Sequence, residues 1–297
     1  MNTFVMTGGT SGIGEIAARR LAGVPGARLL LGTRGAALPE AEAFPLDLAR
    51  LDSVRAFAES IVSQVDGTRI NGLVLNAGIA TPDADSRTAD GFETAFAVNH
   101  LAHYLLLRLL LPHLADGATV VLTTSSTHDP AAGTRMPPPR HADAPLLAHP
   151  DRDAERDRQP GTAGRRAYAS SKLCNILTAR ALAAQPEARQ RDLVVVAYDP
   201  GPTPGTGLMR NGPWALRLAW AALEPLRSLV PRFNGRVATG TVLADIVLGA
   251  IKPPSGRVYA SFQRSHLGWP DPSQLAMSDD AMHALWRDSA ALTGIPK

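Results

Sequence analysis

The chain has a single cysteine, Cys174, among its 297 residues. One cysteine cannot form a disulfide within the chain, and its place in an apolar helical stretch favours packing over use as a nucleophile. The first residues, Met1 to Met6, carry neither a basic leader nor a long apolar segment, so we expect no secretory signal. These absences predict a cytoplasmic protein.

Aromatic residues are also scarce, at 5% of the chain, and they are not interleaved with basic residues. The net charge of +3 and the isoelectric point near 9.3 would suit nucleic-acid binding, but the arginines are dispersed or mixed with acids. This distribution argues against a nucleic-acid partner. With 45% hydrophobic and 19% charged residues and no break in composition, the chain has ample material for one globular core.

The sequence lacks the residue spacing that two kinds of catalytic centre require. His141 and His149 have no carboxylate partner in register, so no metal site is expected. Ser125 and Ser126 are not surrounded by the GxSxG elbow of serine hydrolases. Metal-assisted and serine-hydrolase chemistry are therefore not predicted.

What the sequence does contain is a regular alternation of short β-rich runs and longer helical patterns, as a parallel sheet covered on both faces requires. We predict one doubly wound α/β domain over residues 1–297, with about seven strands. The crossover from Gly35 to Ala43 is too short for a full helix. The predicted strands are Thr3–Thr7, Ala27–Thr33, Phe44–Leu48, Ile70–Leu75, Thr119–Thr124, Leu193–Tyr198 and Arg257–Ala260. The predicted helices are Glu15–Ala22, Leu51–Val65, Phe92–Leu114, Ala167–Ala184, Thr239–Ala250 and Ser278–Leu292.

The first predicted strand runs into a glycine-rich turn that is followed by a helix. This arrangement points backbone N–H groups and the positive end of the helix at a phosphate, and glycines remove side chains where a pyrophosphate must approach. The turn therefore predicts a dinucleotide site. Its expected cofactor-binding residues are Gly8, Thr10, Ser11, Gly12, Ile13 and Gly14.

The second predicted strand ends at Arg34, where an acid would bind the adenosine ribose of NAD. A guanidinium without an acid beside it suits a 2′-phosphate, so we expect NADP(H) to be preferred over NAD(H). The alternative is a solvated surface arginine, because the glycine turn holds no second basic residue.

Tyr168 and Lys172 stand four residues apart in an apolar helical pattern, which places both on one face. A tyrosine titrates near pH ~10, and a neighbouring ammonium is expected to lower that pKa. The pair then becomes a usable general acid and base. The alternative is an ordinary helix with an inward tyrosine and an outward lysine.

Further motifs follow in a fixed order along the chain. They are Asn76-Ala77-Gly78 after the fourth strand, Asn99 inside an apolar helix, Ser125 at the end of the fifth strand and Pro200-Gly201 after the sixth. With the glycine turn, which has the form TGxxxGxG, and with the tyrosine and lysine, this set resembles the short-chain dehydrogenase/reductase family over nearly the whole chain. The stretch from Lys172 to Leu177 is similar to the retinol dehydrogenase and protochlorophyllide reductase branch.

The resemblance implies a Rossmann fold and a catalytic set of four residues. Tyr168 would exchange a proton, and Lys172 would lower its pKa and hold the nicotinamide ribose. Ser125, with Ser126 as the fallback, would orient the reacting oxygen, and Asn99 would support a water relay. The alternative for Asn99 is a core asparagine that is satisfied by its neighbours.

The resemblance also implies further contacts with the cofactor. Besides Tyr168 and Lys172, the implied residues are Asp47, Leu48, Asn76, Ala77, Gly78, Pro200, Gly201 and either Thr203 or Thr206. The spacing after Pro200 departs from the usual PGxVxT form and does not choose between the two threonines. Asp47 has a second interpretation as the N-terminal cap of the following helix, and both can hold at once.

Two segments depart from the family pattern. Asp129 to Arg166 is a Pro- and Arg-rich insertion without periodicity, for which a role at the substrate entrance and mobile decoration are equally supported. At about 203–235 we predict a substrate lid, whose stretch Pro213 to Pro231 is apolar but too charged to span a bilayer. Membrane or partner contact and ordinary core packing are the alternatives for the lid.

The sequence thus predicts an NADP-dependent oxidoreductase that transfers a hydride between nicotinamide and a carbonyl or secondary alcohol of a hydrophobic small molecule. Reduction of an activated C=C or C=N bond at the same site is the first alternative, and a non-catalytic NADP sensor is the second. The resemblance also implies a homodimer through the Phe92 and Ala167 helices, with a monomer as the alternative. No integral membrane segment is expected.

Overall fold

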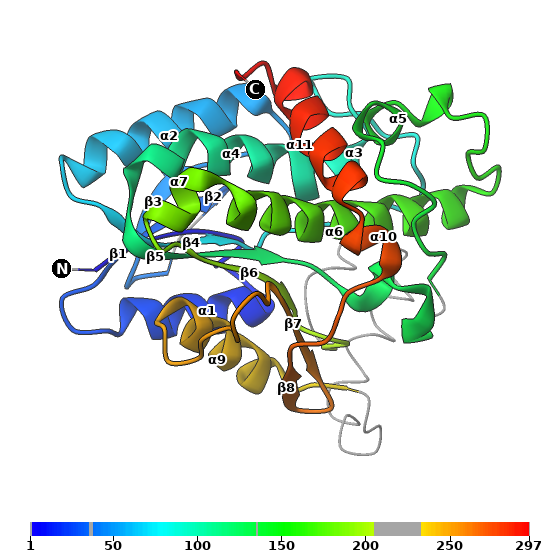
Figure 1. Cartoon of the computed structure of the whole chain (residues 1–297). Helices are drawn as coiled ribbons and strands as arrows, with labels where there is room; N and C mark the ends of the chain where they lie inside the picture. Colours follow the sequence, from blue (N-terminus) through cyan, green and yellow to red (C-terminus); the bar gives the residue numbers. More distant parts are fainter. Residues whose placement is uncertain (1, 36–37, 135, 205–232, 297) are drawn as a thin grey trace.

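The computed structural model describes residues 2–35, 38–134, 136–204 and 233–296 (Figure 1). Two predicted features lie wholly or mostly outside these ranges. Thr206 lies outside the described residues, as does most of the lid expected at about 203–235, including the whole of its apolar stretch.

One sheet of eight strands, in the order β3-β2-β1-β4-β5-β6-β7-β8, forms the centre of the fold. Its strands are β1 (Thr3–Thr7), β2 (Arg28–Thr33), β3 (Glu42–Pro45), β4 (Ile70–Leu75), β5 (Leu114–Thr123), β6 (Val194–Asp199), β7 (Tyr259–Gln263) and β8 (His266–Gly268). The first seven pair in parallel, which confirms the doubly wound α/β prediction. The additional strand, β8, pairs antiparallel with β7. It escaped prediction because it has three residues and follows a tight turn in which Arg264 and Ser265 take positive φ, as hairpin turns do.

Helices cover both faces of the sheet, with α2, α4 and α6 on one face and α1 and α9 on the other (Figure 1). The helices are α1 (Gly12–Ala22), α2 (Leu51–Val65), α3 (Thr94–Phe96), α4 (Ala102–Leu110), α5 (Ala144–Ala148), α6 (Pro160–Ala184), α7 (Pro186–Gln190), α9 (Arg236–Val247), α10 (Gln274–Met277) and α11 (Asp279–Thr293). Each face has its own apolar core, and the strand side chains alternate between the two. Because the first seven strands are parallel, their carboxyl ends lie at the same edge of the sheet.

The crossover after β2 is short, as predicted, and its described residues contain no helix. The third strand was predicted at Phe44–Leu48, two residues too late. In the structure Leu30 pairs with Glu42 and Thr33 with Pro45. This strand lies at the edge of the sheet and is mostly exposed, so it lacks the apolar run that marks a buried strand.

The helix predicted at Phe92–Leu114 is interrupted. After α3 comes a π-helical turn, Ala97–Leu101, then α4 and a 3₁₀ turn, and Leu114 already belongs to β5. Asn99 lies inside the π turn, a feature that often accompanies functional sites. The buried carboxylate of Glu93 caps the start of α3 by accepting the N–H groups of the two residues that follow Thr94, at 2.9 and 2.7 Å.

The run Thr94–His113 is also long and apolar enough to cross a membrane by length and composition, with a mean hydropathy of 1.3. Within the fold, 83% of it is buried, because α4 fills the core against α2 and α6. Burial in the core accounts for its composition. It is the one such helix in the part of the chain that the structure describes.

The C-terminal helix α11 packs on α4 and α6 (Figure 1). The Tyr104 hydroxyl donates to the carbonyl of Trp286 at 2.7 Å, and the Arg108 guanidinium lies 5.1 Å from the ring centroid of Trp286. His100 and Ser289 are joined at 2.9 Å. A helix of the same chain therefore lies on the two helices that were expected to form a dimer surface, and the homodimer stays a prediction.

The insertion at 129–166 is built from short pieces, namely two 3₁₀ turns, α5 and the first turns of α6. The α6 helix begins at Pro160 instead of the predicted Ala167. Ion pairs join the insertion to this helix: the Asp157 carboxylate accepts from Arg166 at 2.6 and 3.0 Å and from Arg140 at 3.1 Å. The insertion is thus fastened to the helix that carries Tyr168.

Candidate active site

A cavity of about 1240 Å³ lies at the carboxyl ends of the parallel strands. The sequence-predicted residues that line it are Gly8, Thr10, Ser11, Gly12, Ile13, Gly14, Arg34, Asp47, Leu48, Asn76, Ala77, Gly78, Ser125, Tyr168, Lys172, Pro200, Gly201 and Thr203. Asn99 lies behind the wall, and Thr206 is outside the described residues. One cavity therefore joins nearly every residue that the sequence singled out, although they come from two helices and from the segments that follow six strands.

The glycine turn between β1 and α1 has no room for side chains. A Cβ on Gly14 would lie 1.9 Å from the carbonyl oxygen of Gly8, and one on Gly8 would lie 2.6 Å from Cα of Ala77. Gly8 and Gly12 also take positive φ, of 68° and 62°. The open floor fits a pyrophosphate, and so do the first N–H groups of α1, which have no acceptor within the helix itself.

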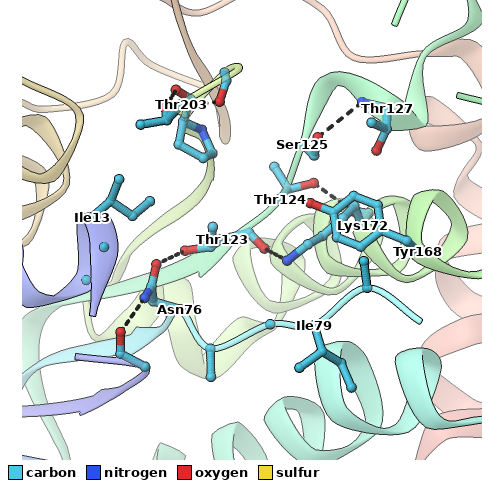
Figure 2. A pocket seen from close by; sticks show the side chains of 18 of the residues that line it. Ile13, Asn76, Ile79, Thr123, Thr124, Ser125, Thr127, Tyr168, Lys172 and Thr203 are labelled. Atoms are coloured by element: carbon cyan, nitrogen blue, oxygen red, sulfur yellow. Dashed lines mark hydrogen bonds between the residues drawn. The ribbon is translucent and has the colours of Figure 1, made fainter. Parts of the chain in front are cut away.

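Asn76 ties the turn to the two neighbouring strand ends (Figure 2). Its Nδ2 donates to the carbonyl of Gly8 at 2.9 Å, and its Oδ1 accepts from the Thr123 hydroxyl at 3.0 Å. The Thr7 hydroxyl oxygen accepts the backbone N–H groups of Asn76 and Ala77, both at 3.1 Å. The cavity floor is therefore held across β1, β4 and β5.

Tyr168 and Lys172 project from α6 toward the end of β5, as Figure 2 shows. They are 6% and 3% exposed. The Lys172 ammonium lies 5.7 Å from the centroid of the tyrosine ring and donates to the carbonyl of Thr123 at 3.1 Å. A Cβ on Gly78 would lie only 3.3 Å from Nζ, so the wall opposite the lysine has to be glycine or give way.

The predicted lowering of the Tyr168 pKa by Lys172 is wrong for this arrangement. Burial raises the pKa of Tyr168 far above its usual range, and of its surroundings only the side chain of Ser125 lowers it. Burial also lowers the pKa of Lys172, to about 8. The shared helix face was predicted correctly, but desolvation outweighs the charge of the neighbour.

Ser125 begins a 3₁₀ turn directly after β5, and its Oγ accepts the N–H of Thr127 at 3.3 Å. Ser126 also lines the cavity, but it is the Ser125 side chain that acts on Tyr168. Ser125 is held by His128, a residue to which the sequence assigned no role. His128 Nε2 accepts the N–H of Ser273 at 3.2 Å, so its Nδ1 carries the proton and donates to the Ser125 carbonyl at 2.8 Å.

Asn99 is buried, and all its side-chain groups are bonded. Its Nδ2 donates to the carbonyl of Ile79 at 2.9 Å and to the Ser171 hydroxyl at 3.0 Å, and its Oδ1 accepts the N–H of Ile79 at 2.8 Å. This matches the alternative of a locally satisfied asparagine. The water relay stays a prediction.

His103, one helical turn beyond Asn99, is a second residue without an assigned role in the sequence. The Thr7 hydroxyl accepts two N–H groups, so it donates to His103 Nε2 at 2.9 Å, and His103 Nδ1 then donates to the Asn99 carbonyl at 3.1 Å. Burial lowers the pKa of His103 to about 4, which keeps the ring neutral. The four-residue spacing between Asn99 and His103 was a signal that the sequence offered for this contact. The hydrogen bond between His103 and Thr7 on β1 could not be predicted from the sequence.

The three residues predicted to meet the adenosine, namely Arg34, which is exposed, Asp47 and Leu48, also line the cavity. The Asp47 carboxylate accepts the N–H of Ala49 at 3.0 Å and does not cap α2. The first N–H of α2 is accepted by Asp90 at 2.9 Å. The capping interpretation of Asp47 is therefore wrong.

The Pro200-Gly201 turn after β6 forms another wall of the cavity. Gly201 has a φ of 63°, and a Cβ there would lie 2.3 Å from the carbonyl oxygen of Phe262. The Thr203 hydroxyl lies 3.2 Å from the carbonyl oxygens of Pro200 and Gly201, so this threonine belongs to the turn.

The two histidines of the insertion have other partners. His141 lies 3.3 Å from the Asp153 carboxylate, and the His149 ring packs on Phe92 with centroids 5.6 Å apart. Within the described ranges, no group of three or more His, Cys, Asp or Glu residues is placed to hold a metal ion.

The chain shares sequence and fold with known proteins. Residues 2–136 match the family described as short chain dehydrogenase. The chain is similar to Dehydrogenase/reductase SDR family member 13 of Bos taurus, with 35% identity over 309 residues that cover 99% of this chain and 73% of that protein. It is also similar to retinol dehydrogenase 12 of Bos taurus, with 30% identity over 98% of this chain and 86% of that protein. Among solved structures, an uncharacterized protein from Mycobacterium Paratuberculosis has 26% identity and a TM-score of 0.67, covering 99% and 94% of the two chains.

Proposed function

From the premise that the chain belongs to the short-chain dehydrogenase/reductase family and is an oxidoreductase, we propose that it reduces a carbonyl group of a hydrophobic small molecule with NADPH, or oxidises the corresponding secondary alcohol. One observation carries the proposal. The side chains of Ser125, Tyr168 and Lys172 meet at one end of a cavity whose other end is the glycine turn.

The high pKa of Tyr168 supports the reductive direction. At neutral pH the phenol keeps its proton, so it is ready to donate that proton to the oxygen of a carbonyl as negative charge develops there. Ser125, at the same end of the cavity, orients the oxygen and stabilises the charge. Bound NADPH supplies the hydride.

The cofactor would lie along the cavity floor. The glycine turn and the first N–H groups of α1 would hold the pyrophosphate, because Gly8 and Gly14 keep side chains away from the floor there. Asp47 and Leu48 would meet the adenine, and the Pro200-Gly201 turn and Lys172 would meet the nicotinamide half. Met136 also lines the cavity, which supports an apolar substrate.

Turnover with a panel of carbonyl compounds tests the proposal. NADPH consumption is measured at 340 nm with apolar ketones, aldehydes and enones, and the products are identified. We expect saturable reduction of a ketone or aldehyde to an alcohol. Saturation of an enone with its carbonyl intact would support the C=C alternative, and NADPH binding without consumption would support the sensor.

Arg34 is expected to set the choice between the two nicotinamide cofactors. Replacing Arg34 with alanine removes a guanidinium suited to the 2′-phosphate, and charge-assisted hydrogen bonds of this kind contribute about 1.5–3 kcal/mol, or about 10- to 100-fold in KM for NADPH. The KM for NADH is expected to stay within about twofold, because NADH has no group for Arg34 to bind. Steady-state kinetics with both cofactors measure the two values.

The matched control is Arg189→Ala. Arg189 is an exposed arginine on α7, which precedes β6 and so lies at the opposite edge of the sheet. It should leave both KM values unchanged. An equal loss with NADH and NADPH in Arg34→Ala, or equal efficiency of the two cofactors in the wild type, would overturn the preference.

The proposal places the enzyme in the cytoplasm. The single thiol, Cys174, is unpaired and fully buried, which is compatible with a reducing compartment. Retention of activity in a soluble extract after removal of membranes is the expected result.

A further inference from the structure

Asp199, the last residue of β6, is a buried carboxylate that the proposed mechanism does not use. It is 1% exposed. Successive residues of a strand point to opposite faces of the sheet. The Tyr198 hydroxyl donates to the carbonyl of Thr239 in α9, at 3.0 Å, so Asp199 faces the side on which α6 lies.

This face also carries Lys172. The ammonium is bonded to the carbonyl of Thr123, and Thr123 is paired with Tyr198, the residue before Asp199. The next residue, Thr124, donates its N–H to the Tyr198 carbonyl at 2.8 Å and its hydroxyl to the Lys172 carbonyl at 2.7 Å. Asp199 therefore stands at the end of β6 and the Lys172 ammonium at the end of the adjacent β5, and neighbouring strands of a sheet lie about 5 Å apart.

The hydrogen bonds of Asp199 are those of an ionised carboxylate, because every partner is a donor. Oδ1 accepts the N–H of Gly201 at 2.9 Å. Oδ2 accepts from Tyr259 at 3.2 Å, from Ser261 at 2.9 Å and from Gln263 at 2.9 Å. Four donors around two oxygens stabilise the negative charge in a buried place.

Lys172 has no such support from its direct contacts. Its hydrogen-bond acceptor is a neutral carbonyl, and no carboxylate of the described residues forms an ion pair with it within 4.0 Å. A buried ammonium with a neutral partner tends to lose its proton. Of the surrounding charges, that of Asp199 favours the protonated lysine.

We propose that the Asp199 carboxylate is the counter-charge that keeps Lys172 an ammonium in its buried site, and that it also holds the nicotinamide-binding turn through the N–H of Gly201. The first part concerns two side chains of the chain itself. The second part, and any effect on catalysis, rests on the proposed function.

The other titratable groups near this pair do not replace Asp199. Burial lowers the pKa of His103 on α4 and of His128 after β5, so both rings are neutral near pH 7. Burial raises the pKa of Tyr168 on α6 and of Tyr259 on β7, so both phenols are also neutral. The charge of Asp129, which follows β5, acts on His128 and Tyr259.

The scarcity of lysine makes a direct measurement practical. Only Lys252 and Lys297 accompany Lys172 in the chain, and Lys252 is exposed. Protein labelled with ¹³C and ¹⁵N at lysine gives three side-chain signals whose pH titrations can be followed by NMR. We expect Lys172 to titrate near pH 8 in the wild type and about one to three units lower in Asp199→Asn, with Lys252 unmoved.

Ser261→Ala is the matched control, since it removes one hydrogen bond to the carboxylate and leaves the charge. Lys172 should titrate there as in the wild type. An unchanged titration in Asp199→Asn, or an equal shift in Ser261→Ala, overturns the proposal. If Asp199→Asn does not fold, Asp199→Glu takes its place. This variant keeps the negative charge, so a fall of the Lys172 pKa by one unit or more in Asp199→Glu also overturns the proposal.

The pH profile of turnover separates an electrostatic role from a structural one. Removing the negative charge lowers the pKa of both Lys172 and Tyr168, so the basic limb of kcat/KM in Asp199→Asn is expected to move to lower pH. If Asp199 only anchors the turn through the N–H of Gly201, its replacement would raise the KM for NADPH equally at every pH. The NMR titration needs no turnover, so an inactive wild type would refute the proposed function while leaving the pairing of Asp199 with Lys172 tested on its own.

Discussion

Replacing Tyr168 with phenylalanine is expected to lower kcat by about 10²- to 10⁴-fold, the usual contribution of general acid catalysis, while NADPH binds as in the wild type. The change removes one oxygen from a side chain that is 6% exposed and faces the cavity. Lys172 keeps its bond to Thr123, so the packing of α6 on β5 is preserved. Single-turnover reduction with saturating NADPH measures the chemical step, and fluorescence titration measures binding.

Tyr104→Phe is the control for the loss of a buried hydroxyl. Tyr104 lies on α4 and donates to Trp286 on α11, outside the cavity. Its replacement should leave kcat unchanged and lower the free energy of unfolding by about 1 kcal/mol. If Tyr168→Phe keeps most of the wild-type kcat, the reacting oxygen receives its proton from another group.

Replacing Gly14 with alanine is expected to weaken NADPH binding by at least about 100-fold or to unfold the N-terminal turn. The new methyl group would lie 1.9 Å from the carbonyl oxygen of Gly8 and 2.5 Å from Nδ2 of Asn76. Overlap with backbone cannot be relieved by rotation of a side chain, so the turn must move, and the N–H groups at the start of α1 move with it. The rise in Tm on adding NADPH, which depends on the ligand's Kd, reports both effects.

The control is Gly161→Ala, in the first turn of α6. A Cβ there meets nothing closer than 3.6 Å. Alanine is the better helix former by about 1 kcal/mol, so stability should not fall and NADPH binding should not change. Wild-type affinity in Gly14→Ala would mean that the cofactor does not use the turn.

Periodicity was enough to predict the order of strands and helices, because the central strands of a parallel sheet are continuous apolar runs. It was insufficient where burial is low or local geometry changes. The edge strand β3 was placed two residues late because it is mostly exposed. The helix around Asn99 was predicted as continuous, since a π turn leaves the apolar pattern intact.

The candidate site was predictable in outline because the carboxyl ends of parallel strands meet at one edge of the sheet. The residues that hold it in place were not, since their partners are distant in sequence. His103 bonds Thr7, 96 residues away, and His128 bonds Ser273, 145 residues away. The effect of Lys172 on the pKa of Tyr168 was predicted wrongly, and the reason is related. Spacing predicts that two residues share a helix face, but it does not predict how deeply that face is buried.

Transfer of deuterium from NADPH that carries deuterium at both hydrogen positions of C4 of the nicotinamide tests hydride transfer most directly. With a ketone or aldehyde that the wild type consumes, mass spectrometry and NMR of the product should find deuterium on the carbinol carbon, and Tyr168→Phe should form that product about 10²- to 10⁴-fold more slowly. An alcohol without deuterium, or no consumption of labelled NADPH with any carbonyl compound despite tight binding, would contradict the proposed reaction.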